Sequence, residues 1–290
     1  MLAGLSERLE THVRALAEAI GERNVLLPQA LRAAEDYIAG QWQDQGYPVR
    51  RYLDRLNGVD CATLEVTVPG CRNPASSIVV GAHYDSVFGS PGADDNASGV
   101  AALLELSRQF LKARPLATVR FVAFANEEPP FFAGRHMGSL IYARTARRRG
   151  ERIRFMVSLE MLGYYDDRPG SQRYPLLLKH FFPDRGNFIA FVSNWRSRIP
   201  LRQLAGAFRA HCDFPLECLS APPLVPGIAA SDHFSFWRQG YPALMVTDTA
   251  YYRNRWYHTA GDLPWRLSYD PFAQVVAGLY EALRVCSQTG

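Results

Sequence analysis

Segments with the hydrophobic period of helices alternate with shorter, mostly apolar segments along the whole chain. Helices are predicted over 6–20, 28–42, 96–112, 137–149, 199–211 and 270–286. Strands are predicted over 48–54, 61–68, 77–82, 117–125, 153–159, 187–193 and 242–247. Because strands that alternate with helices form a sheet covered by helices, this order predicts an α/β sandwich with a largely parallel central sheet.

Cap residues and segment composition predict the boundaries. Ser6 is a candidate N-cap of the first helix, and Asp270 is a candidate N-cap of the last one. The segment over 164–186 is long and irregular, but its composition is not that of a linker. We therefore expect a single domain over 1–290, with the N-terminal helices, about 5–45, packed on it.

Composition and charge are those of an ordinary globular protein, with 48% hydrophobic and 21% charged residues and a net charge of +4. The one dense basic run, Arg144 to Arg154, contains no aromatic residues, so we interpret it as a solvated helix end and not as a nucleic-acid site. No apolar run approaches the roughly 18 residues of a membrane span. Glu7, Arg8 and Glu10 occupy the region where a signal peptide has its apolar core, which predicts a cytoplasmic protein, although a leader removed earlier would leave no trace.

The five cysteines form no recognisable metal-binding or redox motif. No two of them are spaced as CxxC, which argues against a zinc ribbon or a thioredoxin-type site. Cys61 and Cys71 could bridge a short loop, as could Cys212 and Cys218. An odd number of cysteines favours thiols in a reducing compartment, and the sequence leaves the disulfide state of these four residues open.

The histidine and acidic residues that could bind a metal ion follow the predicted strands. The stretch over 81–99 reads GAHYDSVFGSPGADDNASG and contains His83, Asp85, Asp94 and Asp95. Later strands are followed by further candidates, namely Glu127, Glu128, Glu160 and His258. Because open α/β sheets bind ligands at the carboxyl ends of their strands, we expect these side chains to meet at one edge. Imidazole and carboxylate groups together favour a divalent metal site, for which zinc is the usual ion.

Five short motifs occur along the chain in the order GAHYDS, GADDNASG, FANEE, SLEM and WYHTAGD. As an ordered set they resemble the zinc aminopeptidase family, which also includes the glutaminyl cyclases and the glutamate carboxypeptidases. The resemblance covers roughly residues 30–285, nearly the whole chain. It implies a zinc-exopeptidase-like fold, a three-layer α/β/α sandwich around a mixed, mostly parallel sheet of eight strands. It also implies two zinc ions as cofactors.

The resemblance further implies a set of metal ligands, which are His83, Asp95, Glu128, Glu160 and His258. Asp95 would bridge the two ions, a role that requires the two oxygens of a carboxylate. His83 and Glu128 would be terminal ligands. Glu160 and His258 would complete the second ion, with Glu160 at a position where many members have aspartate.

The resemblance implies three catalytic residues, Glu127, Asp85 and Tyr257. Glu127 would be the general base that activates a zinc-bound water. Asp85 would orient His83 through the ring nitrogen that does not bind metal. Tyr257 would either stabilise the oxyanion or form an aromatic wall of the pocket.

A stiff aromatic segment, PPFF over 129–132, follows the predicted base. Its phenylalanines, Phe131 and Phe132, either wall a pocket for an apolar side chain or pack in the core. Together with Tyr251 and Tyr252, they would favour apolar or aromatic residues at the substrate's first position.

The leading hypothesis is a metal-dependent aminopeptidase, a di-zinc exopeptidase that acts on peptides with a free N-terminus. Two alternatives stay open, a glutaminyl-cyclase-like acyltransferase on the same fold and a binding module without metal. Cyclases of the family use one zinc, so the full ligand set favours hydrolysis.

The sequence contains neither GxSxG nor HExxH, which argues against a serine hydrolase and against a helical zinc site. It does not identify which individual residue is preferred, nor does it predict peptide length, the exact metal, oligomeric state or pathway.

Overall fold

The computed structural model of the protein describes residues 2–56 and 58–288. An eight-stranded sheet runs through it in the order β1-β2-β4-β3-β5-β8-β6-β7. The strands are β1 (Arg50–Leu56), β2 (Val59–Val68), β3 (Asn73–His83), β4 (Ala117–Phe124), β5 (Arg152–Glu160), β6 (Ile189–Ser193), β7 (Leu216–Ser220) and β8 (Ala243–Thr247). β4, β3, β5 and β8 are parallel neighbours, whereas β1 with β2, β2 with β4 and β6 with β8 pair antiparallel. The sheet is therefore mixed and mostly parallel in its centre, as predicted.

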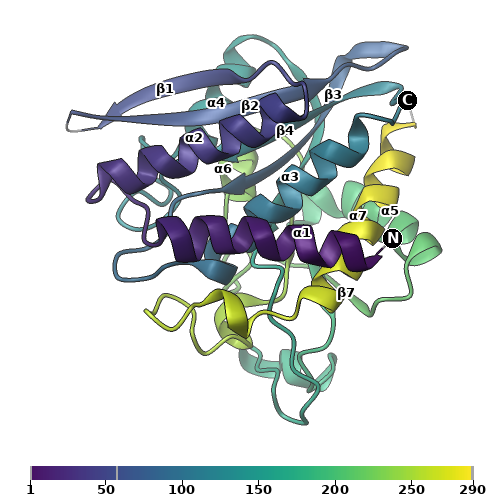
Figure 1. Cartoon of the computed structure of the whole chain (residues 1–290). Coiled ribbons are helices and arrows are strands. Elements are labelled where there is room, and N and C mark those ends of the chain that lie inside the picture. The colour runs from purple at the N-terminus through teal and green to yellow at the C-terminus, as the bar shows by residue number, and fades with distance from the viewer. Residues whose placement is uncertain (1, 57, 289–290) are drawn as a thin grey trace.

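Helices cover both faces of this sheet (Figure 1). They are α1 (Leu2–Arg14), α2 (Pro28–Asp44), α3 (Gly99–Phe110), α4 (Gly138–Arg148), α5 (Arg198–His211), α6 (His233–Arg238) and α7 (Tyr269–Ser287). A π-helical turn over Ala15–Ile20 continues α1, and another over Ala93–Ser98 leads into α3. Short 3₁₀ turns cover Leu176–His180, Trp195–Ser197, Ala250–Tyr252 and Pro264–Arg266. The layers form the expected α/β/α sandwich.

The core lies on both sides of the sheet because the central strands are buried on both faces. Val80 of β3 belongs to the large cluster under α1, α2, α3, α5 and α7, whereas its neighbour Val79 belongs to the cluster under α4 and α6. Both valines are fully buried. This explains why β3 appears in the sequence as a continuous apolar run. Parallel pairing places the carboxyl ends of β3, β4, β5 and β8 at one edge of the sheet.

The sequence analysis did not predict two elements, β7 and α6. β7 has five residues and contains a glutamate, and α6 has six residues, fewer than two helical turns, so neither shows a clear hydrophobic period. Both predicted N-caps were wrong. Ser6 lies inside α1 and donates a hydrogen bond to the Asp270 carboxylate at 2.9 Å, and α7 begins at Tyr269, one residue before Asp270.

None of the five cysteines forms a disulfide within the described chain, so neither short bridge is present. Among residues 2–56 and 58–288, no helix is both long enough and apolar enough to cross a membrane. The prediction of a single domain over 1–290 stays a prediction.

Candidate metal centre

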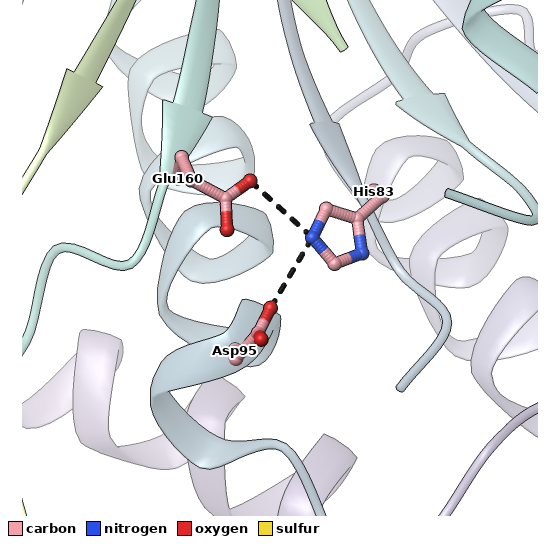
Figure 2. A group of neighbouring side chains, drawn as sticks. All are labelled: His83, Asp95 and Glu160. Carbon is pink, nitrogen blue, oxygen red and sulfur yellow. Dashed lines mark ion pairs between the residues drawn. The ribbon is translucent and has the colours of Figure 1, made fainter. Parts of the chain in front are cut away.

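The strand ends bring five histidine and acidic side chains together at one edge of the sheet. His83 is the last residue of β3, and Glu160 is the last residue of β5. Asp95 lies in the π-helical turn before α3. Two groups form around Asp95, one with His83 and Glu160 and the other with Glu128 and His258. Figure 2 shows the first group, in which the side chains of Asp95 and Glu160 point to the same ring nitrogen of His83.

The two oxygens of Asp95 face different histidines. Oδ1 lies 3.3 Å from His83 Nε2, and Oδ2 lies 3.1 Å from His258 Nε2. Glu160 Oε2 completes the first group at 3.4 Å from His83 Nε2, and Glu128 Oε2 completes the second at 3.2 Å from His258 Nε2. Asp95 is therefore the shared member of both groups, which is the position expected for a bridging ligand.

The structure corrects the predicted grouping of the other four ligands. Glu160 lies with His83 and not with His258, while Glu128 lies with His258 and not with His83. The reason is the strand order, because β3 and β5 are neighbours in the sheet and place His83 beside Glu160. All five predicted ligands nevertheless converge.

The adjacent glutamates Glu127 and Glu128 point in different directions, as predicted. Glu128 faces His258, whereas Glu127 Oε2 lies 4.0 Å from His83 Nε2 and its carboxylate forms no hydrogen bond within the described chain. Asp85 holds the backbone between them, because its two carboxylate oxygens accept hydrogen bonds from the amides of Glu127 and Glu128, each at 3.1 Å. The residue before them, Asn126, has a φ of 56°, an uncommon value for a residue other than glycine.

Asp262 holds the loop that carries the bridging aspartate. Its carboxylate accepts hydrogen bonds from the backbone amides of Asp94 at 2.9 Å and Asp95 at 3.0 Å. Gly92 begins this turn with a φ of 60°, and a Cβ there would lie 2.2 Å from the Asp95 carbonyl oxygen. Asp262 had no predicted role, although it closes the WYHTAGD motif.

Arg23 is a second supporting residue that sequence reasoning missed. It is fully buried, and its guanidinium donates hydrogen bonds to the backbone oxygens of Tyr84, Pro91 and Gly92. It therefore ties both ends of the loop over 84–92 to the N-terminal helices. Burial lowers the pKa of Arg23 to about 10, so it stays charged at neutral pH. Its segment, between two helices, shows no period or motif that would have indicated this role.

Burial and neighbouring charge shift the pKa of each group at the centre. Burial, and then the charge of Asp95, raises the pKa of Glu128 to about 8, and burial also raises the pKa of Glu127 well above its ordinary value. Burial alone would lower the pKa of His258, but the carboxylates of Asp95 and Glu128 raise it to about 10. Four buried carboxylates thus surround two imidazoles, an arrangement that divalent cations would neutralise.

The donor atoms fit divalent ions. His83 Nε2 and Asp95 Oδ1 are buried and have no hydrogen-bond partner among the described residues. A tetrahedral zinc ion with bonds of about 2.0–2.2 Å separates its ligand atoms by about 3.3–3.6 Å. The separations of 3.1 to 3.4 Å within the two groups are close to that range.

An apolar cavity of about 100 Å³ opens beside the centre and is lined by Glu160, Tyr257, Tyr251 and Tyr252, among others. Tyr257 stacks on His258, with ring centroids 3.7 Å apart. The PPFF segment does not line this cavity: Phe131 lines a separate recess, and Phe132 stacks on Phe234.

Comparisons with known protein sequences identify the family. The model of peptidase family M28 matches residues 65–184. The uncharacterized protein YfbL of Escherichia coli (strain K12) is 38% identical over 286 residues, which cover 96% of this chain and 87% of that protein. A probable aminopeptidase of Saccharomyces cerevisiae is 30% identical over 217 residues, 70% of this chain, and the match spans about half, 51%, of its length.

Solved structures share the fold. A zinc aminopeptidase from Bacillus subtilis superposes with a TM-score of 0.76 at 14% identity, covering 98% of this chain and 95% of that one. A glutaminyl cyclase from Fimbriiglobus ruber superposes with a TM-score of 0.70 at 18% identity, covering 97% and 95%. At these identities the likeness shows the fold alone.

Proposed function

Because the chain belongs to peptidase family M28, we propose that it is a metal-dependent aminopeptidase that removes the first residue from peptides with a free N-terminus. The proposed cofactors are two zinc ions. The observation that carries the proposal is the shared carboxylate of Asp95, whose two oxygens face two different histidines. A site for one ion would not need that arrangement.

The chain's own residues would hold the two ions in the observed groups. His83 and Glu160 would bind one ion together with Asp95. Glu128 and His258 would bind the other, again with Asp95. When bound, a pair of divalent ions about 4 Å apart lowers the pKa of a coordinated water and stabilises negative charge on a substrate oxygen.

Glu127 would act as the general base. Its carboxylate lies 4.0 Å from His83 but is a member of neither group, and no hydrogen bond within the described chain occupies it. It is therefore available to take a proton from the attacking water and return it to the leaving amine. General bases in such positions contribute about 10²–10⁴-fold to the rate.

Asp85 and Tyr257 would support this reaction without binding the ions. Asp85 fixes the backbone of Glu127 and Glu128 and so sets the direction of both side chains. Tyr257 lies at the cavity beside His258, where its hydroxyl could donate a hydrogen bond to the oxyanion.

The proposed requirement for a free amine follows from charge. The four carboxylates of Asp95, Glu127, Glu128 and Glu160 balance the charge of two divalent ions, and the buried acidic groups of Asp94 and Asp262 lie behind them. A negative potential at the closed end of a site favours an ammonium group. N-acetylation removes that charge and adds bulk.

The cyclase and the metal-free binding module are less well supported. A cyclase of the family uses one zinc, and one of the two groups around Asp95 would then have no function. A binding module would have no need for the unoccupied carboxylate of Glu127.

The test compares two peptides that begin with leucine, one with a free N-terminus and one N-acetylated, on zinc-loaded protein. The proposal predicts release of leucine from the free peptide only. Equal cleavage of both would contradict it and indicate an endopeptidase or a carboxypeptidase. A third peptide with an N-terminal glutamine tests the alternative, since pyroglutamate formation without hydrolysis would indicate a cyclase.

A further inference from the structure

The cavity beside the metal centre is lined by two carboxylates that lie apart from each other, those of Glu160 and Glu217. Its walls are mostly apolar and include Phe188, Ile228 and Met245. Within the described chain, the charged residues that line it are Glu160 and Glu217, both acidic. Glu160 is one of the proposed metal ligands, whereas Glu217 has no part in the metal centre.

The sheet register places these two carboxylates at opposite ends of one row. Glu160 of β5 pairs with Thr247 of β8, Thr247 pairs with Ala190 of β6, and Ala190 pairs with Glu217 of β7. Paired residues on neighbouring strands point to the same face, so the row forms a floor under the cavity. Three strand spacings of about 4.8 Å put the row's ends about 14 Å apart.

Glu217 has no direct ion-pair partner within the described chain, although the charge of Arg209 acts on it. Its carboxylate forms no ion pair and no hydrogen bond within the described chain, and partial burial raises its pKa above the ordinary value. The neighbouring cation, Arg209, donates instead to the backbone oxygen of Leu216 at 2.9 Å and to Cys218 Sγ at 3.7 Å. The hydroxyl of Tyr174, another lining residue, donates to the carbonyl of Pro183.

Side-chain length decides which first residue could use this carboxylate. A lysine or arginine side chain extends about 6–7 Å from its Cα, and a hydrogen bond adds about 3 Å. Because the Glu217 side chain stands roughly perpendicular to the sheet, these two lengths, about 10 Å in total, cover most of the row. A leucine side chain extends only about 2.5 Å and leaves the far end unfilled. The alkyl stem of lysine or arginine suits apolar walls, and its charged end suits a carboxylate.

We propose that Glu217 is a specificity-determining residue, and that the cavity takes a first residue with a long alkyl stem and a cationic end, lysine or arginine. This inference rests on the proposed aminopeptidase function. It departs from the preference for apolar or aromatic first residues that the sequence suggested, because the row of paired residues under the cavity is longer than such residues and has Glu217 at its far end.

The experiment measures kcat/KM of the zinc-loaded protein for lysine and norleucine amides, which differ in the terminal ammonium group. The ratio for lysine over norleucine should exceed one and should fall about 3- to 10-fold in Glu217→Gln, as expected for a partly exposed charge pair. In Glu217→Lys the ratio should fall further. The matched control is Asp213→Asn, an exposed residue that does not line the cavity, which should leave the ratio unchanged.

The outcomes separate this inference from the function on which it rests. If the wild-type protein hydrolyses neither amide, the aminopeptidase proposal fails. If norleucine amide is hydrolysed but the ratio is the same in wild type, Glu217→Gln and Glu217→Lys, the role of Glu217 is refuted while the function stands. If Asp213→Asn lowers the ratio as much as Glu217→Gln, the effect is general surface charge and the proposed contact is refuted.

Discussion

The Nδ1 atom of His83 lies 3.2 Å from the backbone carbonyl oxygen of Asp85 and 3.6 Å from its carboxylate. The carbonyl is therefore the better hydrogen-bond acceptor for the imidazole. The carboxylate instead accepts the backbone amides of Glu127 and Glu128. The role expected for Asp85, to orient the histidine, belongs mainly to its backbone, and its side chain orients the two glutamates.

This relationship predicts the effect of Asp85→Asn. An amide offers one acceptor oxygen where the carboxylate offers two, so one of the two backbone amides loses its partner. We expect kcat to fall about 10- to 100-fold, as for other supporting residues of metal sites. The histidine keeps its carbonyl contact, so zinc content should change little. Steady-state kinetics with elemental analysis provide the measurement, and an unaltered kcat would show that the backbone is held without Asp85.

Glu127→Gln and Glu128→Gln should separate the base from the ligand. Glu127→Gln keeps the shape of the side chain but cannot take a proton, so kcat should fall about 10²–10⁴-fold while zinc content stays the same. Glu128→Gln replaces a member of the His258 group and should lose zinc as well as activity. The pair serves as its own control, since the two positions are adjacent and the substitution is identical. Equal zinc loss in both variants would disprove this division of roles.

Tyr257→Phe tests the phenol at the cavity. A donor that acts mainly in the transition state lowers kcat more than it raises KM when it is removed. We expect kcat to fall by up to about 10²–10³-fold, and the stacking on His258 should survive because phenylalanine keeps the ring. A rise in KM with kcat unchanged would make Tyr257 a wall of the pocket and nothing more.

Glu105 links acid stability to the packing of α1 on α3. It is buried and accepts hydrogen bonds from Arg8 at 2.9 Å and Arg108 at 2.6 Å. Burial alone would raise the pKa of Glu105, but hydrogen bonds from His12, Arg108 and Arg8 lower it from about 4.5 to about 2. The folded pKa lies below the unfolded one, so the stabilisation is present above about pH 4.5 and is lost as the pH falls towards 2.

Glu105→Gln should therefore lower the free energy of unfolding by about 1–3 kcal/mol at pH 7. The difference from wild type should shrink when urea unfolding is repeated at pH 3. Glu281→Gln is the matched control, because Glu281 pairs with Arg284 on the surface of α7 and should contribute less than about 1 kcal/mol. If Glu105→Gln lowers the free energy of unfolding by the same amount at both pH values, the result would argue against an ion-pair contribution.

Much of the site could be predicted because each ligand follows a strand with a strong apolar pattern. His83 and Glu160 end such strands, and the rule that parallel strands present their carboxyl ends together predicted their convergence. The grouping of the ligands could not be predicted in the same way. It depends on which strands are neighbours, and strand order is not encoded in the local period of any one segment.

The supporting residues were harder to find for a different reason. Arg23 acts through backbone carbonyls of a loop 61 to 69 positions away, and Asp262 acts through backbone amides 167 and 168 positions away. Such contacts leave no spacing pattern in the sequence. The same holds for Glu217, which lies on the short edge strand β7 and reaches the cavity only through the sheet register.

The central claim is that Asp95 joins two metal sites in one centre. Its most direct test is the zinc content per chain after zinc loading and extensive dialysis, measured by elemental analysis on wild type and on His258→Ala. The account predicts about two zinc ions in the wild type and about one in the variant, which keeps the group of His83, Asp95 and Glu160. One zinc ion per chain in a fully active wild-type protein would contradict it.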